Sequence, residues 1–260
     1  MKVETSPSRF VVLCEPRTGS NFLVSMLNSH PEILCHNEVF HPKDIFSGFS
    51  MEDFSLNRRN EDPLAFLQEL FERSFRIDGV EAVGFKIFPT HDSRVLEHIY
   101  SSGSTYKIVL LKRRDRLSQY SSLKIARKTE VWSARSSEHL IQEKVRFSLF
   151  EYLRFASESD DFYRFAETRL REQGASFIKL FYEEIGDKEN LNALLSFLGV
   201  KPHGDQLHGS TRRQNTRVVR RRFLNPTMAI FGSSLEKATR SLRRFWRRRL
   251  RGRPLPARVS

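Results

Sequence analysis

The sequence predicts a three-layer α/β fold, in which helices cover both faces of a central parallel sheet. Apolar runs that suit buried strands alternate along the chain with apolar residues at helical spacing. Such alternation is typical of parallel sheets, because a helix returns the chain to the start of the next strand. The 260 residues are enough for one sizeable α/β domain with its own core.

The expected elements follow one another without an internal repeat. The strands are expected at residues 10–14, 82–89, 106–114 and 175–185, with a short piece in 32–42. The helices are expected directly after the turn at 16–21 and at residues 62–75, 92–100, 116–127, 136–173 and 187–198, and Gly199 suits the end of the last one. Residues 42–63 are polar and contain scattered Phe, so we expect an irregular excursion beside the functional site.

Composition indicates a soluble globular protein of the cytoplasm. Hydrophobic residues make up 39% of the chain, and no apolar run approaches the ~20 residues that a membrane span needs. The first ten residues contain no apolar stretch of a secretory signal. The two cysteines, Cys14 and Cys35, are too few for a disulfide framework or a zinc site, so we expect buried thiols and no metal.

The positive charge of the chain lies at its C-terminal end. Residues 211–260 contain fifteen arginines, one lysine and one acid, a net charge of +15, so residues 1–210 carry −2 of the total of +13. A nearly neutral body argues against a protein that binds nucleic acid over its whole surface.

The turn "PRTGSN" joins the first expected strand to the first expected helix. Backbone N–H groups at such a helix start bind phosphate, and the hydroxyls of Thr18 and Ser20 add donors. Arg17 adds a fixed bidentate charge. The turn lacks the Gly-Lys-Ser/Thr ending that suits a magnesium-bound nucleoside triphosphate. The alternative is an ordinary strand-to-helix turn.

A second basic motif ends the strand at 106–114. Arg113 and Arg114 stand where open α/β sheets bind ligands, and Ser121 and Ser122 follow in the next expected helix. An arginine with a serine eight or nine residues later can hold a second phosphate, although a solvated strand end would carry the same residues.

These motifs together resemble those of the sulfotransferases. "PRTGSNFL" resembles their 5′-phosphosulfate loop, "LLKRRDRLSQYSS" their 3′-phosphate motif, and "FYEEIGDKENLNALLSFLGV" and "TRRQNT" two later elements. The resemblance spans about residues 9–217 and is strongest with bacterial carbohydrate and glycolipid sulfotransferases of the trehalose type. It implies a P-loop-like fold and metal-free transfer of a sulfuryl group from 3′-phosphoadenosine 5′-phosphosulfate (PAPS) to a hydroxyl of a carbohydrate or glycolipid.

The resemblance also implies roles for individual residues. The 5′-phosphosulfate would be bound by Arg17, Thr18, Gly19, Ser20, Asn21 and Phe22, the 3′-phosphate by Arg113 with Ser121 or Ser122, and the adenine by Tyr182. Arg213, Gln214 and Asn215 would close over the nucleotide.

Two residues compete for the role of general base toward the acceptor hydroxyl. Glu38 stands where the trehalose-type enzymes place a catalytic glutamate, and His91 follows the second long strand as a histidine does in the cytosolic family. Lys86 and His36 are further candidates nearby. A salt-bridged structural acid and a surface or capping histidine are the alternative interpretations of the two bases.

The end of the chain departs from the family. Ser233 and Glu236 form a capping-box pattern, and apolar residues then recur at helical spacing opposite arginines. We therefore expect a sulfotransferase domain at 1–232 and a basic amphipathic helix and tail at 233–260. An anionic membrane at the inner face is the expected partner, ahead of a solvated or partner-bound helix and of a nucleic acid or other polyanion.

Two other function classes remain open at this point. One is a P-loop-type small-molecule kinase, which a magnesium requirement would favour, and the other is a non-catalytic nucleotide- or anion-binding module. The presence of base candidates favours an enzyme. The sequence does not indicate which acceptor is used or the oligomeric state.

Overall fold

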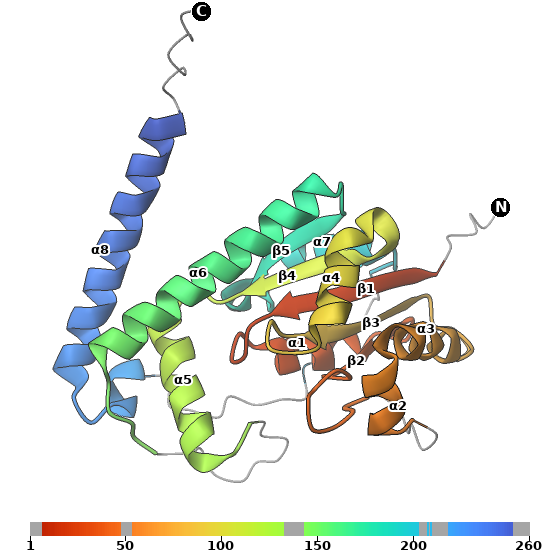
Figure 1. Cartoon of the computed structure of the whole chain (residues 1–260), viewed down its shortest axis with the longest axis horizontal. Helices are drawn as coiled ribbons and strands as arrows, with labels where there is room; N and C mark the ends of the chain where they lie inside the picture. Colours follow the sequence, from red (N-terminus) through yellow and green to blue (C-terminus); the bar gives the residue numbers. More distant parts are fainter. Residues whose placement is uncertain are drawn as a thin grey trace, which may run out of the picture.

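A five-stranded parallel sheet forms the centre of the molecule (Figure 1). The computed structural model describes residues 7–47, 54–132, 143–202, 207, 209 and 218–251. The strands lie in the order β2-β3-β1-β4-β5, and every neighbouring pair is parallel. Their bounds are Ser8–Cys14 (β1), Ile33–His36 (β2), Ala82–Ile87 (β3), Lys107–Lys112 (β4) and Phe177–Phe181 (β5). The expected α/β class and its parallel sheet are confirmed.

Helices cover both faces of this sheet, as the alternation of strands and helices predicts. The helices are α1 (Ser20–Leu27), α2 (Leu56–Glu61), α3 (Pro63–Ser74), α4 (Ser93–Ser101), α5 (Arg116–Thr129), α6 (Leu149–Glu172), α7 (Lys188–Leu198) and α8 (Pro226–Arg251). Alternate residues of β1 point to opposite faces, because successive side chains of a strand do so. Val11 and Leu13 pack in one core with α3, α4 and α6, whereas Phe10 and Val12 pack in another with α1 and α7.

A third, smaller core joins α5, the start of α6 and the start of α8. It contains Tyr120, Tyr152 and Phe223, and an isolated bridge between Val145 and Phe223 closes it. Helix α6 was expected from residue 136 but begins at Leu149, because residues 143–147 run extended and Ser148 caps the helix by accepting from the N–H of Glu151. This core attaches the C-terminal segment to the sheet domain.

Two expectations about irregular and helical segments are wrong in detail. The excursion at 42–63 contains helix α2, whose start Ser55 caps by accepting from the N–H of Arg58. The C-terminal helix begins at Pro226, so Ser233 lies inside it and is not its cap. A proline suits the first turn of a helix, because its missing N–H would have no partner there. The boundary expected at 232/233 therefore falls within one continuous helix.

Candidate active site

The phosphate loop follows β1 at the carboxyl edge of the sheet. Arg17 and Gly19 both have positive φ angles, 65° and 86°. A Cβ atom on Gly19 would lie 2.1 Å from Cδ2 of Tyr182, so only glycine lets this ring rest on the loop. The family resemblance implies that Gly19 binds the 5′-phosphosulfate and Tyr182 the adenine. In the structure these two residues are in contact.

The two hydroxyls of the loop point inward. Thr18 is fully buried, and its Oγ1 donates to the carbonyl of Glu15 at 2.8 Å. Thr18 and Ser20 both hydrogen-bond the thiol of Cys14, and burial raises the pKa of that thiol to about 12. These two hydroxyl groups therefore stabilise the loop through contacts in the protein interior. Among the described residues, no side chain caps the N-terminus of α1, and the first N–H groups of a helix have no partner within the helix, so they are available to an anion.

Two arginines from different elements meet above the loop. Arg113, after β4, donates to the carbonyl of Arg17 at 3.1 Å and to Oγ of Ser118 at 2.6 Å, and its guanidinium lies 4.5 Å from the centre of the Tyr182 ring. Arg17 Nε donates to Oγ of Ser122 at 2.8 Å. Burial and the neighbouring charge of Arg113 lower the pKa of Arg17 to about 10. An anion between the two guanidinium groups would relieve this repulsion.

The structure separates the two serines that the sequence left as alternatives. Ser122 faces Arg17, whereas Ser121 is fully buried and accepts from Arg222 at 3.1 Å. Arg114 is exposed and forms an ion pair with Glu184. Arg113, Arg17 and Ser122 are therefore linked by hydrogen bonds, with Arg113 bound to the carbonyl of Arg17 and Arg17 to the hydroxyl of Ser122.

Sequence reasoning missed Arg222, a buried cation behind this position. It lies in the 3-10 segment η3 (Val219–Arg222) and donates to the hydroxyls of Ser118 and Ser121 at 3.0 and 3.1 Å. Its neighbours Arg220 and Arg221 belong to the same basic run, so no sequence signal distinguishes the buried arginine. The predicted residues Arg213, Gln214 and Asn215 lie outside the described residues.

The base candidates and Lys86 form one cluster next to the loop. Nζ of Lys86, on β3, lies 2.9 Å from Oε1 of Glu38 and donates to Oδ1 of Asn21. Nε2 of His91 lies 3.6 Å from Oε2 of Glu38. Lys86 is 1% exposed, so its charge acts in a setting with little water to screen it. A cation from a neighbouring strand thus stands beside the loop, which has no lysine of its own.

The ring of His91 has a defined orientation in this cluster. Its Nδ1 accepts from the backbone N–H of Phe88 at 3.3 Å, so the neutral ring carries its proton on Nε2, facing Glu38. Burial alone would raise the pKa of Glu38, but the contacts to His91 and Lys86 outweigh it and lower the pKa to about 2. Glu38 is therefore ionised, and the Nε2 atom of His91 faces its carboxylate at 3.6 Å.

Two further histidines, His36 and His41, lie near this cluster. His36 is fully buried, contacts Oγ of Ser74 at 2.9 Å and has its pKa lowered to about 4 by burial, so it belongs to the core. The ring of His41, which sequence reasoning missed, lies 6.1 Å from that of His91 and 5.2 Å from that of Phe46. In the sequence, only its position three residues after Glu38 could have pointed to His41.

Two aromatic residues, Trp132 and Phe22, lie beside the phosphate loop. Trp132 accepts a hydrogen bond from Arg17 through its carbonyl, and its side chain is largely exposed. Phe22 is half-buried beside Gly209, where a Cβ atom would lie 2.1 Å from Cε2 of the ring. Within the described residues, no group of three or more His, Cys, Asp or Glu side chains is arranged to hold a metal ion.

Comparison with known proteins supports the interpretation of these motifs. No family model matches the chain. The chain is 28% identical over 233 residues to Nodulation protein H of Rhizobium tropici, which covers 85% of this chain and 87% of that protein. This match extends over most of both chains and supports the interpretation of the chain as a sulfotransferase. The resemblance stated from the motifs is confirmed at this level, and the trehalose-type subgroup stays a prediction.

Solved sulfotransferase structures are also similar to the chain. A sulfotransferase from Alicyclobacillus acidocaldarius matches with a TM-score of 0.45 and 17% identity, covering 83% of this chain and 89% of that one. A mouse sulfotransferase complexed with PAP, 3′,5′-adenosine bisphosphate, matches with a TM-score of 0.34 and 16% identity, covering 77% and 61% of the two chains.

Proposed function

We propose that this sulfotransferase transfers a sulfuryl group from PAPS to a hydroxyl of a carbohydrate or glycolipid, with Glu38 as the general base. One observation carries the proposal: Asn21, Lys86, Glu38 and His91 form an unbroken series of polar contacts leading out of the phosphate loop. A cation and a base thus lie next to the position where the transferred group would be held.

The donor side of the site suits a nucleotide with phosphates at both ends. The N-terminus of α1 supplies backbone donors for the 5′-phosphosulfate, and Arg17, Arg113 and Ser122 supply charge-assisted donors for the 3′-phosphate. The ring of Tyr182 lies against Gly19 and Arg113, where it can pack on the adenosine. This donor set fits PAPS, because two half-buried arginines lie together where a 3′-phosphate would add negative charge.

Glu38 is the better base of the two candidates. His91 Nε2 already carries a proton directed at Glu38, so it supports the carboxylate and cannot receive a proton in that tautomer. The carboxylate removes the proton of the acceptor hydroxyl as the oxygen attacks sulfur. Lys86 stabilises the charge that develops on the bridging oxygen of the leaving group. As Lys86 turns from Glu38 toward that charge, the carboxylate loses a neighbouring cation and becomes a stronger base.

Aromatic side chains beside Glu38 support a carbohydrate acceptor. Phe46 is 44% exposed and lies edge-on to His41, in the same loop as Glu38. Exposed rings next to a base suit the apolar C–H face of a sugar, while the charged groups take its hydroxyls. Incubation of PAPS with a disaccharide, and with the same sugar on a lipid chain, tests this assignment. Sulfated sugar is the expected product, and sulfation of a phenol or an amine alone would contradict it.

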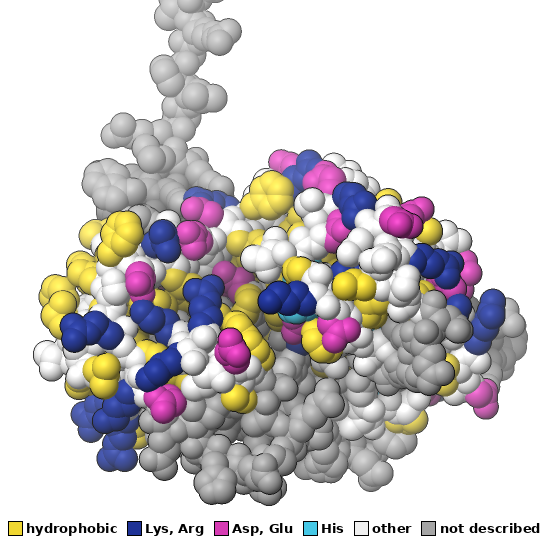
Figure 2. All heavy atoms as spheres, turned by 60° about the horizontal axis from the view of Figure 1, so that its bottom comes forward, with side chains coloured by type: hydrophobic (Ala, Val, Ile, Leu, Met, Phe, Trp, Pro, Cys, Tyr) yellow, Lys and Arg dark blue, Asp and Glu magenta, His cyan; other side chains and the backbone are white. Residues whose placement is uncertain are grey.

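Helix α8 supports a lipid-linked acceptor. It packs on the body through Ala229 and Glu236, whereas Met228, Phe231 and Leu242 lie on its opposite side, about half exposed. Hydrophobic side chains gather at the left edge of the molecule, near the start of α8 (Figure 2). The helix contains eight bases and one acid, so two copies would repel each other while an anionic bilayer would attract the helix.

Vesicle binding tests this part of the proposal. No described helix is long and apolar enough to cross a bilayer, so binding would be at the surface. Phe231→Ser combined with Leu242→Ser should reduce binding to anionic vesicles at least about fivefold, because each change removes apolar area from the interface. Phe165→Ser, which alters an exposed ring on α6, is the matched control. Equal binding by the double variant and the control would exclude the membrane assignment.

A further inference from the structure

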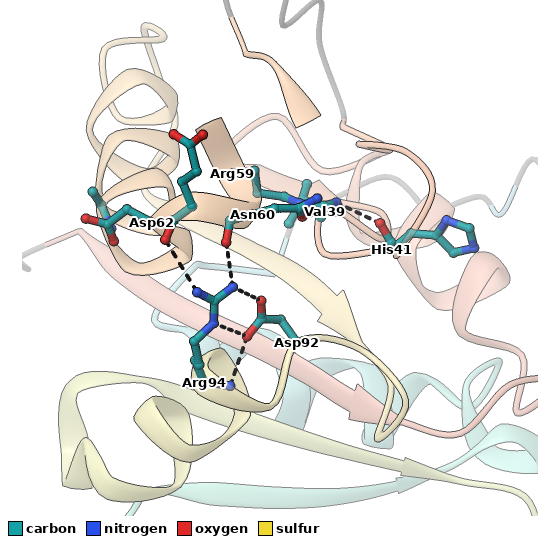
Figure 3. Close-up of polar contacts among 9 residues, drawn as sticks. Val39, His41, Arg59, Asn60, Asp62, Asp92 and Arg94 are labelled. Atoms are coloured by element: carbon teal, nitrogen blue, oxygen red, sulfur yellow. Dashed lines mark hydrogen bonds and ion pairs between the residues drawn. The ribbon is translucent and has the colours of Figure 1, made fainter. Parts of the chain in front are cut away.

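Helix α2 connects the loop that carries Glu38 with the turn that carries His91 (Figure 3). Its Arg59 is 3% exposed and enters the loop formed by residues 37–47. One nitrogen, NH1, donates to the carbonyls of Val39, His41 and Asp44 at 3.0, 2.7 and 2.9 Å. Because residues 37–47 contain no helix or strand, this guanidinium holds their backbone in place.

The other end of the connection lies at the start of α4. Asn60 accepts from Arg59 through its side-chain oxygen, and its carbonyl accepts from NH2 of Arg94 at 2.7 Å. Arg94 also forms a two-bond ion pair with Asp92, at 3.1 and 2.7 Å. Asp92 directly follows His91 and caps α4 by accepting from the N–H of Arg94 at 2.9 Å.

The two ends of this chain of contacts are the two residues that meet in the active site. Glu38 directly precedes Val39, His91 directly precedes Asp92, and their side chains lie 3.6 Å apart. Proton transfer requires reacting groups held to within about 0.5 Å. We infer that Arg59, Asn60, Asp92 and Arg94 form an α2 clamp that positions Glu38 against His91, an inference that rests on the proposed function of Glu38.

The clamp belongs to the acceptor side alone. Of the proposed donor-binding residues, Arg17 follows β1, Arg113 follows β4 and Ser122 lies on α5, whereas the clamp joins α2, residues 37–47 and the start of α4. Arg94 is exposed, and an exposed ion pair adds little to the stability of the fold, because water screens the attraction between its charges. Loss of Arg94 should therefore alter catalysis far more than folding or nucleotide binding, which a purely structural role would not do.

Arg94→Gln is the central test, with Arg58→Gln as the matched control. Arg58 is an exposed arginine on α2 that pairs with Glu69 at 2.8 Å, outside the clamp. We expect Arg94→Gln to lower kcat about tenfold or more, since small displacements of reacting groups are costly, while PAP affinity changes less than about twofold. Arg94→Lys should restore part of the rate, and Asp92→Asn combined with Arg94→Gln should cost little more than either change alone.

A second readout does not depend on turnover. The groups facing Glu38 are Lys86 and His91, with His41 from its own loop. If loss of the clamp loosens the contact between Glu38 and His91, the pKa of Glu38 should rise in Arg94→Gln. NMR of labelled glutamate carboxyls measures this shift, and the pKa of Glu38 should stay unchanged in Arg58→Gln. If this pKa shift occurs in Arg94→Gln but the parent protein has no sulfotransferase activity, the clamp is supported and the proposed function is rejected. Equal kcat and equal Glu38 titration in the two variants would reject the clamp.

Discussion

The donor side and the acceptor side of this active site are built in opposite ways. The donor side is one strand, one turn and one helix, with Arg113 added at the end of the neighbouring strand. The proposed acceptor side joins the loop after β2, the end of β3 and the start of α4, and helix α2 contacts both the loop and α4. Local motifs are therefore enough to define donor binding, whereas the position of the base depends on contacts between distant segments.

Removal of the base should give the largest separation between the two sides. Glu38→Gln keeps the shape of the side chain but removes its ability to take a proton, so kcat should fall by about 10² to 10⁴. PAP affinity should stay unchanged, because Glu38 contacts the donor loop only through Lys86. Rate measurements and calorimetry on the same sample check both parts. A rate loss confined to His91→Ala would reverse the roles of the two residues.

A change in the phosphate loop should instead weaken binding of the donor nucleotide. Gly19→Ala places a Cβ atom against Tyr182 in a backbone conformation with φ of 86°, so we expect at least about tenfold weaker PAP binding and a lower melting temperature. Tyr182→Ala in the same chain should recover part of the stability, because it removes the clash but not the strain. Unchanged PAP affinity in Gly19→Ala would contradict the proposed loop geometry.

The same contrast explains what the sequence could and could not predict. The turn residues Arg17 to Asn21 and the strand-end Arg113 are local signals, and the structure brings them together with Tyr182. Glu38, Lys86 and His91 could be nominated, but their mutual contacts could not, since they require the register of β2 and β3. Arg59 and Arg222 were not found, because no sequence pattern separates a buried arginine from an exposed one, and Arg94 was not found because its contacts with Asn60 depend on the placement of α2.

A smaller effect is expected in the dependence of stability on pH. The pKa of Glu38 in the folded protein, about 2, lies below its ordinary value of 4.5. A depressed pKa stabilises the fold fully above pH 4.5, and this contribution is lost as the pH falls from there toward 2. The difference in stability between the parent protein and Glu38→Gln should therefore shrink over that range. Denaturant titrations at pH 7, 4.5 and 3 measure this difference in the free energy of unfolding. A difference that does not change with pH would mean that Glu38 lacks these ion contacts.

Calorimetry with PAP, adenosine 5′-phosphate and magnesium-ATP tests the donor assignment most directly, because it needs no acceptor. The account predicts that PAP binds at least about tenfold more tightly than adenosine 5′-phosphate, with or without EDTA. Arg113→Ala should remove most of that difference, because a hydrogen bond to a charged group is worth about 1.5–3 kcal/mol. Equal affinity for PAP and adenosine 5′-phosphate, or tighter binding of magnesium-ATP, would contradict it.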